Sequence, residues 1–343
     1  MRRELPTELR RELLALCDEL RALASKSLAR SSRAALLRIA AHGAGDVTFA
    51  LDVPCERAVE RWHARLARRA PLSVLTEETG WRHLGPGRSR VRELADGDHG
   101  GWSIVIDPID GTRNLAAGLR SAWTAIAVVP PLARAPRFAD VSGGLLSELP
   151  TSAMHRWRRL SSLAQRPTLE LHEIGRARPL ERRPLRVSSS FDPRAPGYWS
   201  FFRYTPAQRP LLAAVEARFF ERMRRAHALE LRCAFDDQYI SNAGQLALLS
   251  LGAYRMIVDA RALVAERARI PGTSSKPYDV AGALAVARAA GCVVAAPDGA
   301  ALDFPLDATT PVSFAGYGNA RIARAARPLV ADELARAIRA AQR

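Results

Sequence analysis

The sequence predicts an α+β protein in which helices and sheets stack in layers. Helical patterns and short β-rich runs both occur along the 343 residues, but they do not alternate regularly as in a doubly wound sheet. With 48% hydrophobic and 25% charged residues, the composition is that of an ordinary globular protein. A chain of this length can form one large domain or two lobes with a shared interface.

The first third of the chain predicts helices first and buried strands afterwards. Apolar residues at helical spacing, and later β-rich runs bounded by Gly and Pro, carry this prediction. In chain order we expect two amphipathic helices within 7–42, an extended piece at 48–52, a helix from Pro54 to Ala70, a strand within 71–80, a loop or hairpin at 81–100, and a strand at 101–111 that runs into a turn.

The remainder predicts a mixed region that ends in helices. Segment 155–186 is rich in arginine and its pattern assigns neither helix nor strand. The helix at 279–290 has Asp279 at its start and Gly291 just after its end, which is the usual capping asymmetry. We also expect strands at 122–131, 141–151, 255–260 and 292–296, and helices at 210–229, 245–254 and over the last twenty residues.

Cysteine usage and hydropathy exclude several protein classes. The four cysteines form no CxxC pair, so we expect buried free thiols and neither a disulfide framework nor a zinc knuckle. No stretch approaches the roughly 20 apolar residues that cross a bilayer, and the N-terminus lacks the apolar core of a secretory signal. We therefore expect a cytoplasmic protein without membrane attachment.

The net charge of +16 raises a non-enzyme alternative, a protein that binds nucleic acid or another polyanion. Lys26 and Lys276 are the only lysines, and the arginines are dispersed along the chain. The sequence shows no helix-turn-helix, RNP motif or interleaved aromatics, so we expect no specific nucleic-acid partner. A basic surface would still attract a small anionic substrate.

The stretch SIVIDPIDGTRNL, residues 103–115, ends a predicted buried strand with two carboxylates. Pro108 restricts the backbone between Asp107 and Asp110. Such a turn can direct both carboxylates and the Ile109 carbonyl to one point, and a set of oxygen ligands of this kind suits Mg²⁺. The backbone N–H groups of Gly111 and Thr112 could bind an anion beside it.

Each of these acids also has a purely structural interpretation. Asp-Pro-x-Asp-Gly is a good turn sequence in its own right, because Asp side chains accept hydrogen bonds from nearby amides. Adjacent glutamates such as Glu77 and Glu78 are usually solvated, and Asp279 alone would be an ordinary N-cap. The functional interpretation gains weight because all these acids lie at predicted strand or helix ends.

Three motifs together resemble those of the inositol monophosphatase family. They are LTEETG at 75–80, IDPIDGTRNL at 106–115 and KPYDVAGALAVARAAGCVV at 276–294. This family comprises metal-dependent, lithium-sensitive phosphatases, and its superfamily includes fructose-1,6-bisphosphatases and 3'(2'),5'-bisphosphate nucleotidases. The resemblance implies an αβαβα sandwich of the sugar-phosphatase type, a phosphoric monoester hydrolase, and two or three Mg²⁺ ions in each site. Members of this family often form homodimers.

The resemblance also implies roles for individual residues. Glu77, Asp107 and Thr112 would be catalytic, with Glu77 orienting and Thr112 positioning the attacking water. Glu78 would lie just outside the direct ligands. The implied metal ligands are Glu77, Asp107, the Ile109 carbonyl, Asp110, Asp279 and, for a weaker third ion, Asp52.

The implied substrate contacts are less complete than the metal ligands. They are Gly111, Thr112, Asp110, Asn242, Gly244 and Lys276. Lys276 stands in the segment where the family often has an acid that contacts the inositol ring. An inositol-1-phosphate-like substrate is the first expectation, with a 3'(2'),5'-bisphosphate nucleotide or fructose 1,6-bisphosphate as alternatives. We expect an N-terminal lobe, 1–183, with most metal ligands, and a C-terminal lobe, 184–343, with Asp279 and substrate contacts.

Overall fold

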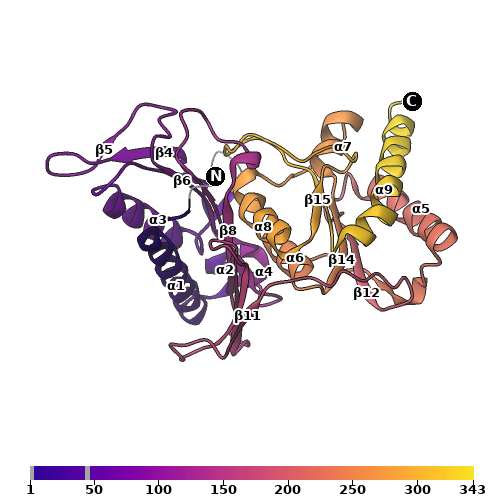
Figure 1. Ribbon diagram of the computed structural model, residues 1–343, viewed down its shortest axis with the longest axis horizontal. Helices are drawn as coiled ribbons and strands as arrows, with labels where there is room; N and C mark the ends of the chain where they lie inside the picture. The colour runs from indigo at the N-terminus through magenta and orange to yellow at the C-terminus, as the bar shows by residue number, and fades with distance from the viewer. Residues whose placement is uncertain (1–3, 43–46) are drawn as a thin grey trace.

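Five alternating layers of helices and sheets make up the protein (Figure 1). The computed structural model describes residues 4–42 and 47–343. From one end to the other the layers are α1 with α3, a nine-stranded sheet, α6 with α8, a five-stranded sheet, and α5 with α7 and α9. The predicted layered α+β fold, and the αβαβα sandwich that the resemblance implies, are therefore confirmed.

The described residues form helices and strands with the following bounds. The helices are α1 (Thr7–Arg30), α2 (Arg33–Leu36), α3 (Val53–Leu66), α4 (Thr112–Ala116), α5 (Arg209–His227), α6 (Asn242–Ser250), α7 (Arg261–Ala268), α8 (Pro277–Ala290) and α9 (Ala320–Ala341). The strands are β1 (Ile39–His42), β2 (Val47–Phe49), β3 (Leu72–Thr76), β4 (Gly80–Gly85), β5 (Arg92–Glu93), β6 (Trp102–Asp110), β7 (Ala122–Val129), β8 (Gly143–Leu149), β9 (Arg156–Ser161), β10 (Thr168–Glu173), β11 (Glu181–Pro184), β12 (Gly197–Phe201), β13 (Ala234–Phe235), β14 (Tyr254–Asp259), β15 (Val293–Ala295) and β16 (Phe314–Tyr317).

The nine-stranded sheet has the order β11-β10-β9-β8-β7-β6-β3-β4-β5. Neighbouring strands are antiparallel except for β3 and β6, which run parallel. The register between β6 and β7 shifts, because Asp107 pairs with Ala125 whereas Asp110 pairs with Trp123. Three steps along β6 thus oppose two along β7, which is a β-bulge. The bulge redirects the end of β6 where the two aspartates lie.

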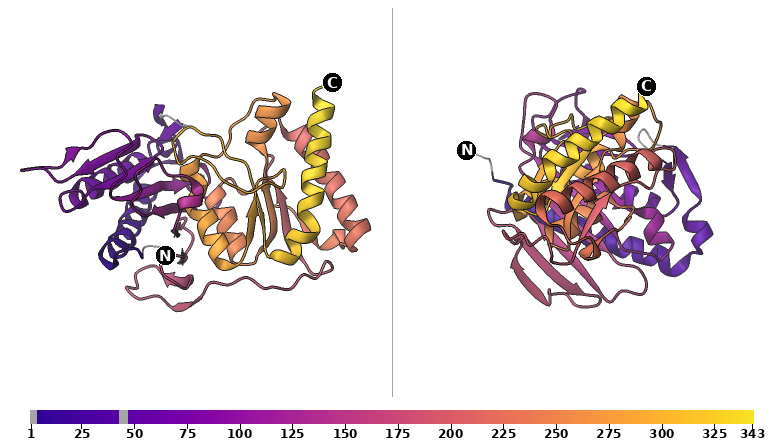
Figure 2. Two further views of the ribbon diagram at one scale, coloured as in Figure 1. Left: turned by 45° about the horizontal axis from the view of Figure 1, so that its top comes forward. Right: turned by 90° about the vertical axis from the view of Figure 1, so that its right-hand side faces the viewer.

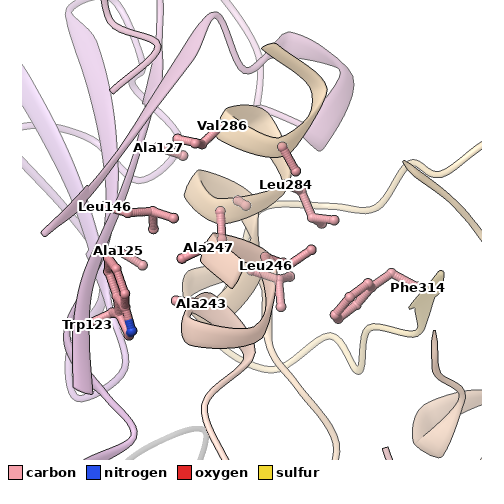
Figure 3. Packing of buried hydrophobic residues seen from close by; sticks show 14 of the residues in the cluster. Trp123, Ala125, Ala127, Leu146, Ala243, Leu246, Ala247, Leu284, Val286 and Phe314 are labelled. Atoms are coloured by element: carbon pink, nitrogen blue, oxygen red, sulfur yellow. The ribbon is translucent and has the colours of Figure 1, made fainter. Parts of the chain in front are cut away.

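Helices α6 and α8 fill the space between the two sheets. Buried side chains from both helices and both sheets form one continuous apolar cluster (Figure 3). Helix α8 approaches the first sheet very closely, since a Cβ atom at Gly282 would overlap the Ile126 carbonyl, and one at Gly144 would overlap the Gly282 carbonyl. Small residues at this contact allow the helix backbone to lie directly on β7 and β8.

The second sheet, of order β13-β12-β14-β16-β15, forms the fourth layer. Its far face is covered by α5 and α9, which lie side by side in both views of Figure 2. Aromatic and branched side chains fill this interface, including Trp199, Phe201 and Phe219. Strand β14 of this sheet leads to the start of α7, which borders the candidate site described below.

Several predicted elements differ from the structure. Only one long helix forms within 7–42, because the chain after the single turn of α2 extends as β1 and pairs with β2. Segment 155–186, which the pattern left unassigned, forms β9, β10 and β11. These three strands widen the sheet. The sequence analysis did not find α7, β12 or β16. Cys17, Cys55 and Cys292 are free and buried as expected, whereas Cys233 is half-buried.

The predicted lobe boundary coincides with Pro184, the last residue of β11. All strands of the nine-stranded sheet lie before it and all strands of the five-stranded sheet lie after it. A single core joins the two sets, and the division into lobes remains a prediction. No helix in the described ranges 4–42 and 47–343 is long and apolar enough to cross a membrane. The cytoplasmic location and the homodimer also remain predictions.

Replacing Gly282 with alanine should destabilise the protein by about 2 kcal/mol or more, because the new methyl group meets fixed backbone of β7. Denaturant unfolding followed by circular dichroism measures this loss. Gly100→Ala is the matched control, since its methyl group would meet only the Asp98 side chain. Equal stability of the two variants would contradict the close approach of α8 to the sheet.

Candidate active site

The loop from Asp107 to Thr112 forms the centre of the candidate site. After the bulge, the Ile109 N–H donates to Asp107 Oδ1 at 2.9 Å and closes a tight turn. Gly111 follows with φ +101°, a left-handed conformation that strongly favours glycine, and it begins α4. A side chain at Gly111 would also approach Ser241 to 3.0 Å. The local sequence therefore requires glycine here for both conformation and space.

A cavity of about 300 Å³ opens above this loop. It brings together the end of β6 and the starts of five helices, α3, α4, α6, α7 and α8, which lie far apart in the sequence. Of the predicted site residues, those that line it are Asp52, Glu77, Asp107, Ile109, Asp110, Gly111, Thr112, Asn242, Lys276 and Asp279. Glu78 and Gly244 are not among its lining residues.

The acids in this cavity repel one another in a poorly solvated place. Burial raises the pKa of Asp107 well above its ordinary value, and the carboxylates of Asp110, Asp279 and Glu77 raise it further. Burial also raises the pKa of Asp110 to about 6, although hydrogen bonds from Ser241 and Ala243 and the charge of Arg261 oppose the shift. Positive charge that enters the cavity would therefore stabilise the ionised form of these acids.

Asp110 and Asp279 each bind the start of a helix. Asp110 Oδ2 accepts hydrogen bonds from Ser241 Oγ at 2.7 Å and from the Ala243 N–H at 2.6 Å, at the start of α6. Asp279 Oδ2 accepts from the Lys276 N–H at 2.7 Å, at the start of α8. The capping interpretation is therefore correct for Asp279 and does not exclude a second role, because one carboxylate has several acceptor positions.

Asp52 and Thr112 form a hydrogen-bonded pair at the edge of the cavity. Thr112 Oγ1 lies 2.8 Å from Asp52 Oδ1 and 2.9 Å from the Ile109 carbonyl oxygen, so the hydroxyl is held between two acceptors. The second oxygen of Asp52 accepts from the Phe49 N–H at 2.8 Å. Burial raises the pKa of Asp52 to about 6, against the lowering effect of these two bonds.

The donor set fits a hard divalent cation in its chemistry. The carboxylates and the Ile109 carbonyl supply only oxygen, the ligand type that Mg²⁺ prefers. Across the described residues, however, no group of three or more His, Cys, Asp and Glu side chains is close enough to hold a metal ion as arranged. Asp110 and Asp279 are oriented by their bonds to the α6 and α8 backbones. Binding a cation therefore requires small side-chain reorientations.

Arg261 is a cavity residue that the sequence analysis missed. It is 2% exposed and pairs with the fully buried Asp259, with Nε and Nη2 donating to the two carboxylate oxygens at 2.8 and 2.7 Å. The remaining N–H groups donate to Tyr204 Oη, the Thr273 carbonyl and Ser275 Oγ. All five donors are used, so Arg261 fixes the 272–276 segment in place. The acid at the end of the RMIVDA strand was the available sequence signal.

The predicted substrate residues face different surroundings. Lys276 lines the cavity, and its ammonium donates to the Thr309 carbonyl at 2.8 Å. The Asn242 side chain donates to Asp259 Oδ2 at 3.1 Å and so joins the Arg261 network. Gly244 lies in the first turn of α6, where a side chain would overlap the Tyr239 ring. Glycine at this position serves helix packing, and the predicted contacts with substrate remain untested.

Glu56 is a second missed residue, on the helix α3 that follows Asp52. It is 4% exposed, and its Oε2 has no hydrogen-bond partner among the described residues. Burial raises its pKa to about 8, and the carboxylates of Glu78 and Asp52 add to the shift. At neutral pH the folded protein therefore holds this side chain mainly protonated. Glu78 thus lies close to the acids of the cavity without lining it.

Comparisons with known proteins identify the class of fold. Solved structures that resemble the chain include fructose-1,6-bisphosphatase from Leishmania major, with a TM-score of 0.66 and 14% identity over 96% of this chain and 95% of that one. A Pyrococcus horikoshii protein with similarities to inositol-1 monophosphatase has a TM-score of 0.61 and 16% identity over 94% and 97%. The extragenic suppressor protein SuhB from Bartonella henselae has a TM-score of 0.59 and 14% identity over 96% and 98%.

These likenesses span nearly the full length of this chain and of each solved structure. No family model and no curated protein matches the sequence. The chain therefore shares the fold of these solved structures, which is the fold that the resemblance of its motifs implied. At identities of 14–16% the likeness establishes the fold, and the chemistry must be argued from the residues of the cavity.

Replacing Glu56 with glutamine should make stability less dependent on pH. The folded state keeps the Glu56 proton up to about pH 8, whereas the unfolded chain releases it near its ordinary pKa of 4.5. The free energy of unfolding should therefore fall as pH rises between these values, by at most about 1.4 kcal/mol per pH unit, and Glu56→Gln should remove this slope. Urea unfolding with EDTA at several pH values measures it.

Glu266→Gln is the matched control, because Glu266 is also a helical glutamate but is exposed. Its pH profile should follow that of the unmodified protein. If the slopes of Glu56→Gln and the unmodified protein agree, Glu56 is ionised in the folded state and the assignment of its buried proton is wrong.

Proposed function

We propose that this chain is a metal-dependent phosphatase that hydrolyses a small phosphorylated metabolite. One observation carries the proposal: Glu77, Asp107, Asp110 and Asp279 line the same cavity as the Gly111–Thr112 turn. Oxygen ligands for cations and backbone amides for an anion thus occur together. A fold shared with proteins described as inositol monophosphatases and fructose-1,6-bisphosphatases supports this interpretation.

The residues proposed to hold Mg²⁺ are Glu77, Asp107, the Ile109 carbonyl, Asp110, Asp279 and, for a third ion, Asp52. Bound there, the metal would activate water and neutralise charge on the phosphate and on the leaving oxygen. The repulsion that raises the pKa of Asp107 is relieved when a cation enters, so the protein itself favours binding. Glu78 would act on this site only through its negative charge.

Thr112 and Asp52 are proposed to handle the attacking water. The Thr112 hydroxyl is held between the Asp52 carboxylate and the Ile109 carbonyl, so a water beside it has a defined position. With its pKa near 6, Asp52 can accept a proton through this hydroxyl close to neutral pH. Glu77 would orient the same water from the other strand. The amides of Gly111 and Thr112 would hold the phosphate oxygens.

The substrate side of the cavity suits a polar, anionic molecule. Arg113 and Lys276 add positive charge to the lining, and Tyr204, Thr273 and Ser274 add hydroxyl groups. An inositol-1-phosphate-like substrate remains the first proposal. Lys276 favours a second anionic group, which keeps a 3'(2'),5'-bisphosphate nucleotide and fructose 1,6-bisphosphate as alternatives.

Replacing Asp110 with asparagine should lower phosphate release by more than about a hundredfold while the protein stays folded, because a direct metal ligand is removed. The amide oxygen can still accept from the Ala243 N–H, so α6 keeps its cap. Release of inorganic phosphate measures the effect. Asp298→Asn, which breaks an exposed ion pair with Arg267, is the matched control and should be fully active. Unchanged activity in Asp110→Asn would refute the assigned site.

Removal of divalent metal should abolish phosphate release, and added Mg²⁺ should restore it. A panel of inositol 1-phosphate, fructose 1,6-bisphosphate and 3'-phosphoadenosine 5'-phosphate, assayed after EDTA treatment and again with Mg²⁺, tests metal dependence and substrate together. The highest kcat/KM identifies the preferred substrate. Equal hydrolysis with and without metal would contradict the proposed mechanism, in which the metal activates the water and neutralises the phosphate charge.

A further inference from the structure

A second cavity, of about 1050 Å³, shares no lining residue with the candidate active site. It lies where the start of α1, the β7–β8 connection, the β9–β10 turn and the last turns of α8 meet. Four arginines line it, from four separate segments: Arg10, Arg166, Arg182 and Arg288. Glu4 is the only acid among the lining residues that the structure describes. The cavity is therefore strongly basic.

The protein neutralises part of this charge. Glu4 accepts a hydrogen bond from Gln165 at 3.0 Å. Arg182 lies 3.5 Å from Glu170 and is 66% exposed. No ion pair within residues 4–42 and 47–343 involves Arg10 or Arg166. Like charges around one cavity repel each other unless an anion enters, so this arrangement favours an anionic ligand.

The walls between the arginines are partly apolar. Phe138, Val141 and Leu163 line the cavity, and the Arg288 guanidinium lies over the Phe138 ring at 4.2 Å. Thr7, in the first turn of α1, lies at the rim. A helix start whose N-cap, Pro6, makes no side-chain cap bond leaves amide groups available to a negative charge. Phe138 is fully buried and its ring already contacts Arg288 and Phe304, so the charged groups of this cavity carry ligand recognition.

We propose that this cavity binds a small polyanionic metabolite that carries two or more phosphate groups. Arginine binds phosphate oxygens in a planar, two-pronged geometry that suits several phosphate groups at once. The volume is of the size that holds such molecules. The site is independent of the proposed phosphatase reaction, since none of its residues is assigned a role there. An experiment can therefore refute ligand binding at this cavity without refuting the proposed function, and can refute the proposed function without refuting ligand binding here.

The cavity is connected to the candidate active site through α8. Arg288, near the end of this helix, is nine residues from Asp279, which corresponds to about 13 Å of helix rise. Ala285 and Ala289 line the cavity on the same helix face as Arg288. A ligand here would thus contact the helix that presents Asp279, without reaching the catalytic cavity itself.

Isothermal titration calorimetry with ATP, in buffer with EDTA, tests the proposal on the full-length protein. EDTA removes the metal that phosphate binding in the active site would use. We expect one saturable site, and a Kd at least about tenfold higher in the double variant Arg10→Gln/Arg166→Gln. Arg321→Gln/Arg324→Gln, which removes the same charge from the exposed face of α9, should bind ATP as the unmodified protein does.

Three outcomes would overturn the proposal. The first is the absence of saturable ATP binding. The second is an equal loss of ATP affinity in the α9 control, which would indicate diffuse charge attraction. The third is a loss of ATP affinity in Lys276→Gln while the arginine variant binds normally, which would place ATP in the active site. Arg166 is exposed, so Arg166→Gln alone preserves the fold if the double variant does not. Inorganic tripolyphosphate should also bind at this site, because the arginines recognise phosphate groups.

Discussion

Electrostatic repulsion among buried carboxylates is the constraint around which this molecule is organised. Asp107 is buried, and Asp110, Asp279 and Glu77 all raise its pKa. Unpaired buried charge is costly, so the surrounding structure has to be rigid enough to keep these groups together. The protein does so with a β-bulge, a left-handed Gly111 and two helix starts whose amides bind Asp110 and Asp279.

The middle helical layer positions residues of the candidate site. Helix α8 lies directly on β7 and β8 because Gly282 and Gly144 carry no side chain at the contact. This close approach positions the first turn of α8, which carries Asp279, relative to the end of β6. On the other side of the cavity, the Asp259–Arg261 pair fixes the 272–276 segment with every guanidinium donor in use. Packing and buried polar bonds thus define the two walls.

The molecule separates its charges into two cavities of opposite character. One gathers acids at strand and helix ends, and the other gathers arginines from four segments. In each cavity one sign of charge predominates, so each favours an ion of the opposite sign. Elsewhere, many arginines are held in ion pairs on the surface, such as Arg65 with Glu12 and Arg134 with Asp140. The net charge of the chain alone does not distinguish these cases.

By itself, the sequence determined the layered fold class and the motif that carries Asp107, Asp110 and Gly111, because these depend on local turn geometry and hydrophobic periodicity. The tertiary structure decided features that depend on residues distant in the chain. Strand pairing made β1 and extended the first sheet through β9 to β11. Burial gave Glu56 its proton and Arg261 its network, and the packing of distant segments placed Arg166 near other arginines. Burial and long-range pairing leave no signature in local spacing, since each depends on which distant segments pack together.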